Sequence, residues 1–239
     1  MRARIKNILK INWFATLKLN LKVVPLKELF KCPILVYRGF SINEFKGEII
    51  FNAPIQFGIL VFGQPYEIFT RSGCKGEAVI NGQLIINGRV QFGIDTKLYI
   101  KQNGILSLGH INSFAARTEV ICFKKIVLED WIQFGNDCLI CDTNFHNLKD
   151  ISTNEILPMN KEILIRSHNF IGARTTIKGN TITPENCLVA TNSLLNKNYT
   201  SLGEHILIGG IPAWKIKDNI SRDWETEKEA LLDYLTIKL

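Results

Sequence analysis

A six-residue period from Cys122 onward restricts the possible fold more than any other feature of the sequence. Apolar residues recur at every sixth position, and a second apolar residue stands two positions before each later member of the series. Each such pair encloses one residue that would point the other way, which is the spacing of a very short β-strand. Turn-forming residues such as Gly135, Asn136 and Asp137 fall between the pairs and let the chain bend. The two series are Cys122, Leu128, Phe134 and Ile140, and Ile126, Ile132 and Cys138.

The period is interrupted at residues 141–162 and returns over residues 165–195. Residues four positions after the aliphatic place are small or polar, as a tight interior corner requires. A helix would show an apolar period of about 3.6 residues, and an ordinary meander would need strands of about five residues. A parallel β-solenoid, with coils stacked about 4.8 Å apart, fits better than either. The aliphatic series is Ile165, Ile171, Ile177, Thr183, Val189 and Leu195, and the polar series is Asn169, Thr175, Thr181, Cys187 and Ser193.

This pattern divides the chain into three segments. Residues 47–217 are predicted to form the solenoid, because residues 47–121 also contain closely spaced apolar pairs with glycine and asparagine at the corners between them. Residues 218–239 are predicted to form a C-terminal helix that Ser221 can cap and that packs across the end of the solenoid or on a neighbouring subunit. Residues 1–46 are a basic N-terminal arm and lead-in.

The net charge of +7 arises in the first fifth of the chain, where residues 1–50 contain 10 Lys and Arg against 3 Asp and Glu. In residues 1–14, apolar residues alternate with basic ones as in a short amphipathic helix. Such a helix either contacts a membrane surface or packs on its own domain. Lysines interrupt every apolar run, so we expect neither a secretion signal nor a membrane span. Six scattered cysteines favour reduced thiols, and we expect a cytoplasmic protein that can associate with the inner face of the membrane.

Three stretches carry a resemblance to a known family. Segment 140–146, ICDTNFH, is similar to the aspartate-x-x-x-histidine segment of the hexapeptide-repeat acetyltransferases. Segment 169–179, NFIGARTTIKG, resembles their tryptophan-isoleucine-glycine repeat, with Phe170 in the tryptophan's place, and segment 208–217, IGGIPAWKIK, resembles their closing glycine-x-proline-alanine stretch. The sequence departs from the family pattern in two places. ATNS at 190–193 replaces a glycine-alanine-glycine-serine repeat, and Trp214 stands where a basic residue is common. The match is strongest for the branch that O-acetylates sugars of surface polysaccharides.

The resemblance implies a left-handed parallel β-helix that assembles as a homotrimer with active sites between subunits. It implies acetyl-CoA as co-substrate and a sugar of a capsule or lipopolysaccharide, or its precursor, as acceptor. Backbone N–H groups at the Gly172-Ala173 corner could meet the thioester, and lysines could meet the phosphates or simply be solvated. Asn144 is expected to contact the acceptor. The residues expected at the coenzyme are Phe170, Gly172, Ala173, Thr191, Lys197, Lys215 and Lys217.

His146 is the expected catalytic base. A sugar hydroxyl must lose its proton as it attacks a thioester, and histidine is the side chain that titrates near neutral pH. Of the four histidines, only His146 lies in the interruption between repeat blocks, whereas His110, His168 and His205 are expected at corners or on the surface. Asp142, four residues earlier, either orients the imidazole or shapes the turn.

Other functions stay open on the sequence alone. N-acetylation of an amino sugar or nucleotide sugar would use the same base. A zinc-dependent hydratase would need about three histidine ligands, so we expect no metal ion, and a scaffold without activity would not need the His146 loop. The pair Cys138 and Cys141 has redox or zinc spacing, but the solenoid pattern already places Cys138 inside. We expect no nucleic-acid partner.

Overall fold

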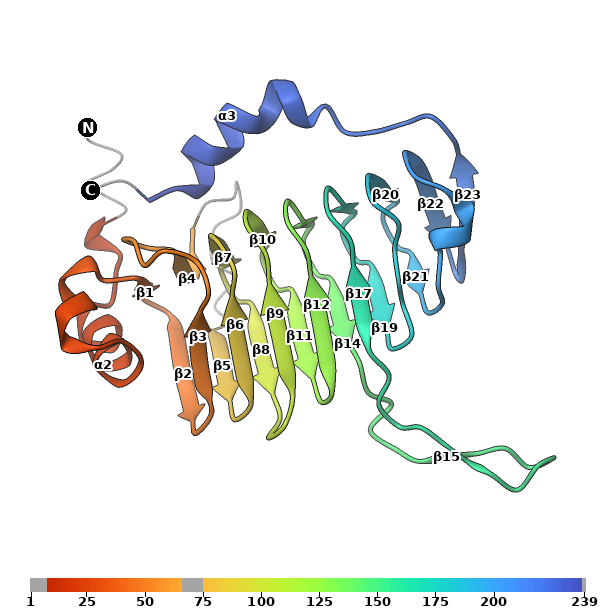
Figure 1. Cartoon of the computed structure of the whole chain (residues 1–239), viewed down its shortest axis with the longest axis horizontal. Helices are drawn as coiled ribbons and strands as arrows, with labels where there is room; N and C mark the ends of the chain where they lie inside the picture. The colour runs from red at the N-terminus through yellow and green to blue at the C-terminus, as the bar shows by residue number, and fades with distance from the viewer. Residues whose placement is uncertain (1–7, 66–74, 238–239) are drawn as a thin grey trace.

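The computed structural model describes residues 8–65 and 75–237, which wind into a parallel β-helix with three sheets (Figure 1). The nine-stranded sheet contains β1 (Ile34–Val36), β4 (Leu60–Gln64), β7 (Val90–Gly93), β10 (Asn112–Phe114), β13 (Gln133–Phe134), β18 (Phe170–Ile171), β20 (Cys187–Val189), β22 (Ile206–Gly210) and β23 (Ala213–Lys217). The seven-stranded sheet contains β2 (Phe40–Phe45), β5 (Gly76–Ile80), β8 (Lys97–Ile100), β11 (Glu119–Cys122), β14 (Leu139–Cys141), β19 (Thr176–Lys178) and β21 (Leu194–Leu195). The five-stranded sheet contains β3 (Glu48–Phe51), β6 (Gln83–Ile86), β9 (Ile105–Leu108), β12 (Lys125–Leu128) and β17 (Ile163–Ile165).

Successive strands visit the nine-, seven- and five-stranded sheets in turn, so each coil has three corners, and stacked corners form three edges of a prism. We call the edge between the seven- and five-stranded sheets the loop edge, because residues 142–162 leave it. The edge between the nine- and seven-stranded sheets is the Gly172 edge, and the third is the tail edge. The strands run from Ile34 to Lys217, where the sequence predicts a solenoid over 47–217, and the last pair, β22 and β23, is antiparallel.

The repeat series form the core, as the period predicts. Every member of both series before the interruption is buried, and so are all members after it, including Thr183. A column of phenylalanines runs through the coils, with ring centres 5.2, 5.2, 4.5 and 5.0 Å apart. Stacked aromatic pairs at this spacing add to the burial of their area. The column contains Phe40, Phe62, Phe92, Phe114 and Phe134.

The polar series closes corners by hydrogen bonding. The hydroxyls of Thr175, Thr181 and Ser193 each donate to the carbonyl oxygen three residues earlier, at 2.7 Å. A short side chain that satisfies a buried carbonyl is what a tight interior corner needs. The small residues of the repeat are therefore explained by the turn itself.

The N-terminal helix differs from the prediction. Residues 1–7 of the predicted basic helix lie outside the described residues, and the helix that the structure describes here is α2 (Trp13–Val23), followed by the 3-10 helix η1 (Leu26–Lys31). Asn20 Oδ1 accepts the Ile34 N–H at 3.1 Å, and its Nδ2 donates to the Ile34 carbonyl at 2.7 Å. The helix thus covers the open backbone of the first coil, which the amphipathic pattern of residues 1–14 does not reveal.

The C-terminal helix α3 (Trp224–Leu235) runs along the tail edge rather than across the end of the solenoid (Figure 1). Asp223, not Ser221, caps it, because Asp223 Oδ1 accepts the Thr226 N–H at 3.1 Å. The Trp224 ring lies edge-on to Trp131 and His168, with centres 6.4 and 5.7 Å apart. The contacts of Trp224 with Trp131 and His168, at two coil corners, therefore position the start of α3 against the β-helix.

Two further predictions concern cysteines and membrane spans. The five described cysteines are free and buried, whereas Cys74 lies outside the described residues. Within residues 8–65 and 75–237, no helix has the length and apolar character needed to cross a bilayer.

Candidate active site

The interruption at residues 141–162 is a hairpin that projects from the loop edge (Figure 1). Its arms are β15 (Leu148–Lys149) and β16 (Ile156–Leu157), which pair antiparallel. An isolated bridge between Thr143 and Asn160 joins the arms where they leave the solenoid. Strand β14 ends at Cys141 and the chain re-enters β17 at Ile163, so the loop spans residues 142–162.

Asp142 anchors the base of this loop to the preceding coil. Its carboxylate accepts the N–H groups of Phe123 at 2.7 Å and of Lys124 and Lys125 at 2.7 and 2.9 Å, and the residue is 1% exposed. Of the two roles considered for Asp142, these bonds correspond to the shaping of the turn. The carboxylate is engaged by three backbone amides, and the structure gives no hydrogen bond between it and His146.

Lys178 and Thr143 fix the next step of the chain. Lys178 Nζ donates to the Thr143 carbonyl oxygen at 2.7 Å, and Thr143 Oγ1 accepts the Phe145 N–H at 3.0 Å. Phe145 has a φ of 61°, in the left-handed region. The chain is therefore held in a sharp, defined turn directly before His146.

His146 and Asn144 are both exposed at the base of the hairpin, as a base and an acceptor contact would have to be. The Asn144 backbone N–H donates to the Met159 carbonyl at 3.0 Å, and the Asn144 residue is exposed to solvent. Both residues therefore lie on the exposed part of the loop. Their chemical roles remain predictions.

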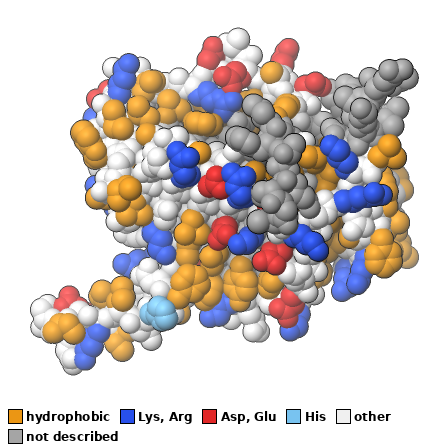
Figure 2. All heavy atoms as spheres, turned by 180° about the vertical axis from the view of Figure 1, so that it is seen from behind, with side chains coloured by type: hydrophobic (Ala, Val, Ile, Leu, Met, Phe, Trp, Pro, Cys, Tyr) orange, Lys and Arg blue, Asp and Glu red, His pale blue; other side chains and the backbone are white. Residues whose placement is uncertain are grey.

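A row of aromatic side chains ends at Phe145, the residue before His146 in the chain, and was not singled out from the sequence. Phe145 packs edge-on against Phe123 with ring centres 5.5 Å apart, and Phe123 packs against Tyr99 at 5.7 Å. Lys101 Nζ lies 4.6 Å from the Phe123 ring centre. Figure 2 shows hydrophobic side chains gathered where the hairpin leaves the solenoid. Tyr99 could have indicated this row from the sequence, because it is a large aromatic residue at an outward position of its strand.

The predicted coenzyme corner lies on another edge of the prism. Gly172, Ala173 and Thr191 lie on the Gly172 edge, whereas His146 lies on the loop edge. The Gly172 N–H donates to the Val189 carbonyl at 2.8 Å, so it is not available to a thioester oxygen, contrary to expectation. A Cβ at Gly172 would come within 2.6 Å of the Thr191 nitrogen, so glycine serves close stacking of the coils here.

The other predicted coenzyme residues already have partners or are spread apart. The Arg222 guanidinium lies 5.3 Å from the Phe170 ring centre, and Lys215 Nζ lies 2.9 Å from Asp218 Oδ1. Lys197, on the loop edge, lies over the Tyr199 ring at 5.5 Å, and Lys217 is exposed at the end of β23. Within a single chain, these residues therefore do not cluster around His146.

A hollow of about 660 Å³ beside the hairpin base is lined by lysines that the sequence reasoning missed. Lys124, Lys125 and Lys161 contribute to its wall. Glu162 lies between two of them, 3.3 Å from Lys124 Nζ and 3.8 Å from Lys125 Nζ. The hollow therefore presents three lysines and one glutamate next to the loop.

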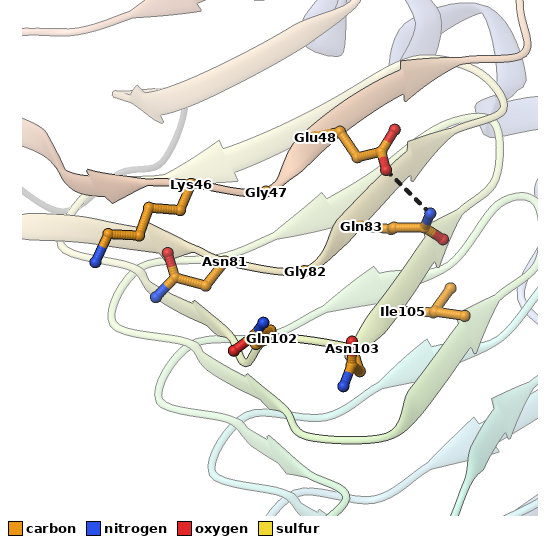
Figure 3. Close-up of a pocket in the computed structure, with 9 residues that line it drawn as sticks. All are labelled: Lys46, Gly47, Glu48, Asn81, Gly82, Gln83, Gln102, Asn103 and Ile105. Atoms are coloured by element: carbon orange, nitrogen blue, oxygen red, sulfur yellow. Dashed lines mark hydrogen bonds between the residues drawn. The ribbon is translucent and has the colours of Figure 1, made fainter.

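A second hollow, of about 610 Å³, lies on the loop edge at the first coils (Figure 3). Gly47 and Gly82 line it, and a Cβ at Gly82 would come within 2.2 Å of the Gly104 carbonyl oxygen. A hydrogen bond of 3.2 Å joins Gln83 to Glu48 across one side. Its other polar side chains are amides and Lys46, so the lining offers no histidine or thiol for acyl transfer.

The Cys138 and Cys141 pair is part of the packed interior. Both residues are 1% exposed, and burial raises the pKa of Cys138 from 9.0 to about 11. A thiol with a raised pKa is a poor nucleophile and a poor metal ligand. Among the described residues, no group of three or more His, Cys, Asp or Glu is placed to hold a metal ion.

Comparison with known proteins supports the fold. No protein-family model matches the chain, and no curated protein matches it in sequence. Among solved structures, the polysialic acid O-acetyltransferase OatWY is 16% identical with a TM-score of 0.55, covering 77% of this chain and 87% of its own. The polySia-specific acetyltransferase NeuO is 18% identical with a TM-score of 0.54, covering 82% of this chain and 97% of its own. The chain folds as the left-handed parallel β-helix that the resemblance implies.

Proposed function

We propose that this chain is an acetyl-CoA-dependent O-acetyltransferase acting on a sugar hydroxyl of a surface polysaccharide or its precursor. The observation that carries the proposal is the placement of an exposed His146 on a turn fixed by Asp142 and Lys178, beside an aromatic row. Two proteins with the same fold act on polysialic acid by O-acetylation or acetylation, which supports this reaction. The protein would act in the cytoplasm, where acetyl-CoA is available.

In the proposed reaction, His146 is the general base. Its imidazole takes the proton of the acceptor hydroxyl as that oxygen attacks the thioester carbonyl carbon. The new C–O bond forms, the C–S bond breaks, and the imidazolium returns its proton to the departing thiolate. Acetyl-CoA supplies the activated acetyl group, and the rest of the work is positioning.

The aromatic row is suited to hold the acceptor. Phe123 and Phe145 present ring faces and edges directly before the base, and the C–H face of a sugar packs well on such rings. Lys101 lies over Phe123, and Lys124 and Lys161 line the neighbouring hollow. These lysines would favour an acceptor that carries carboxylates or phosphates.

The coenzyme site would be shared between two chains of a homotrimer. Within one chain, His146 lies on the loop edge, away from the Gly172 edge. In a trimer, the loop edge of one copy can meet the Gly172 edge of its neighbour. With the Gly172 N–H already bonded, the Ala173 N–H is the candidate donor to the developing oxyanion. Lys197, Lys215 and Lys217 would reach the coenzyme phosphates, Lys215 by leaving Asp218.

The proposal is tested by incubating the purified chain with acetyl-CoA and a panel of acidic and neutral oligosaccharides. We expect release of the coenzyme thiol and a gain of one acetyl mass on a hydroxyl-bearing acceptor, and no reaction with His146→Asn. The matched control is His205→Asn, another exposed histidine, which should keep wild-type turnover. Transfer only to amino sugars would establish N-acetylation instead, and undiminished turnover by H146N would refute the role of the base.

A further inference from the structure

The first helical elements carry a large apolar surface that faces away from the β-helix. We call it the α2–η1 surface. Isolated exposed apolar residues are ordinary, but several large apolar side chains on two consecutive helical elements point to an interaction site. Its members, with their exposed fractions, are Phe14 (79%), Leu17 (48%), Leu21 (56%), Leu26 (80%) and Phe30 (80%).

Helix α2 buries one side against the β-helix, and its opposite side carries exposed apolar residues. Thr16, Leu19 and Asn20 face the first coil and are buried. Phe14, Leu17 and Leu21 are spaced three and four positions apart, so they share the opposite side. One side of α2 therefore packs on the first coil, and the opposite, apolar side remains exposed.

Basic side chains border this surface. Lys18 and Lys22 follow Phe14 along α2, Lys27 follows Leu26, and all three lysines are exposed. Glu28 is the one acidic residue among positions 1–43, and Lys31 pairs with it at 2.6 Å. Figure 2 shows hydrophobic and basic side chains side by side at the end of the molecule away from the hairpin. In an interfacial helix, apolar residues insert between the lipids and lysines lie at the level of the headgroups.

We propose that the α2–η1 surface binds an anionic phospholipid bilayer. Each lysine near such a surface adds to the attraction, and the apolar side chains enter the interface. A second copy of this chain is a poorer occupant, because a two-fold contact would bring lysines against lysines. Since α2 and the hairpin lie in different parts of the molecule, the loop edge stays open to solvent on the bilayer (Figure 1). This inference does not depend on the proposed reaction.

Vesicle co-sedimentation of the full chain tests the proposal. We expect binding to vesicles of phosphatidylcholine with phosphatidylglycerol, and much less binding to phosphatidylcholine alone. Lys18→Glu with Lys22→Glu should weaken binding by about tenfold or more. Phe14→Gln with Leu17→Gln and Leu21→Gln should weaken it by a similar factor while keeping the helix, because glutamine has good helix propensity.

The matched control is Trp214→Gln with Ile216→Gln, which removes two exposed apolar side chains from β23 at the other end of the β-helix and should bind as the wild type does. Brominated lipids should quench the fluorescence of Trp13, 41% exposed on α2, and Trp13→Phe should remove that quenching. Wild-type binding by both surface variants would overturn the proposal. So would a wild type that ignores anionic vesicles while the triple glutamine variant changes oligomeric mass in ultracentrifugation, which would assign the surface to a contact between copies.

Discussion

The ammonium group of Lys178 donates a hydrogen bond to the carbonyl oxygen of Thr143, with Nζ and O 2.7 Å apart. Lys178 ends β19, in the coil after the loop, so this bond ties the start of the hairpin to the β-helix. His146 follows three residues beyond Thr143. The position of the proposed base therefore depends on a side chain that need not touch the substrate.

Replacing Lys178 by methionine should lower kcat by about tenfold to a hundredfold with a small change in KM. Methionine fills similar space but cannot donate to Thr143, and a small displacement of a catalytic group has costs of this size. Steady-state kinetics would measure the effect, with Lys149→Met in the hairpin as the control. A wild-type kcat for K178M would show that the turn holds His146 without this bond.

Asp142→Ala should destabilise the protein by about 3 kcal/mol, because three backbone N–H groups lose their charged acceptor in a buried turn. Asp142→Asn keeps one acceptor oxygen and should cost about half as much. Urea unfolding gives the free energies, and turnover is then measured well below the unfolding transition. If D142N were fully stable yet inactive, Asp142 would act on the imidazole rather than on the turn.

The six-residue period was enough to predict the coils, because burial on one face of a short strand leaves a direct trace in the sequence. It could not predict that Asn20 covers the backbone of Ile34 or that Trp224 packs on His168, since these contacts join residues far apart in the chain. The sequence could not decide between the two roles of Asp142, or show that the Gly172 N–H is already bonded, for a related reason. Both make hydrogen bonds to a neighbouring coil, and spacing along one coil says nothing about bonds between coils.

Phe145→Leu should raise the KM for the acceptor by about fivefold to tenfold and change kcat less. Leucine remains apolar, but it removes the ring face proposed for the sugar, an aromatic contribution of about 1 kcal/mol. Acceptor saturation curves would measure this effect. Phe30→Leu, on the α2–η1 surface, is the control and should leave the acceptor KM unchanged. Equal KM values for the two variants would remove the aromatic row from the acceptor site.

Buried thiols should make the fold sensitive to alkaline pH. Burial raises the pKa of Cys187 from 9.0 to about 12 and that of Cys138 from 9.0 to about 11. Both stay protonated in the folded state, whereas the unfolded chain ionises near its ordinary value. Their contribution to stability is therefore complete below pH about 9 and is lost as the pH rises toward the folded pKa.

Between pH 8 and 10, the ionisation of each thiol in the unfolded chain should lower the unfolding free energy by about 1.4 kcal/mol. Urea unfolding of Cys187→Ala should show a loss over this range that is smaller than the wild-type loss by that amount. The same loss in both proteins would mean that Cys187 does not govern the alkaline transition.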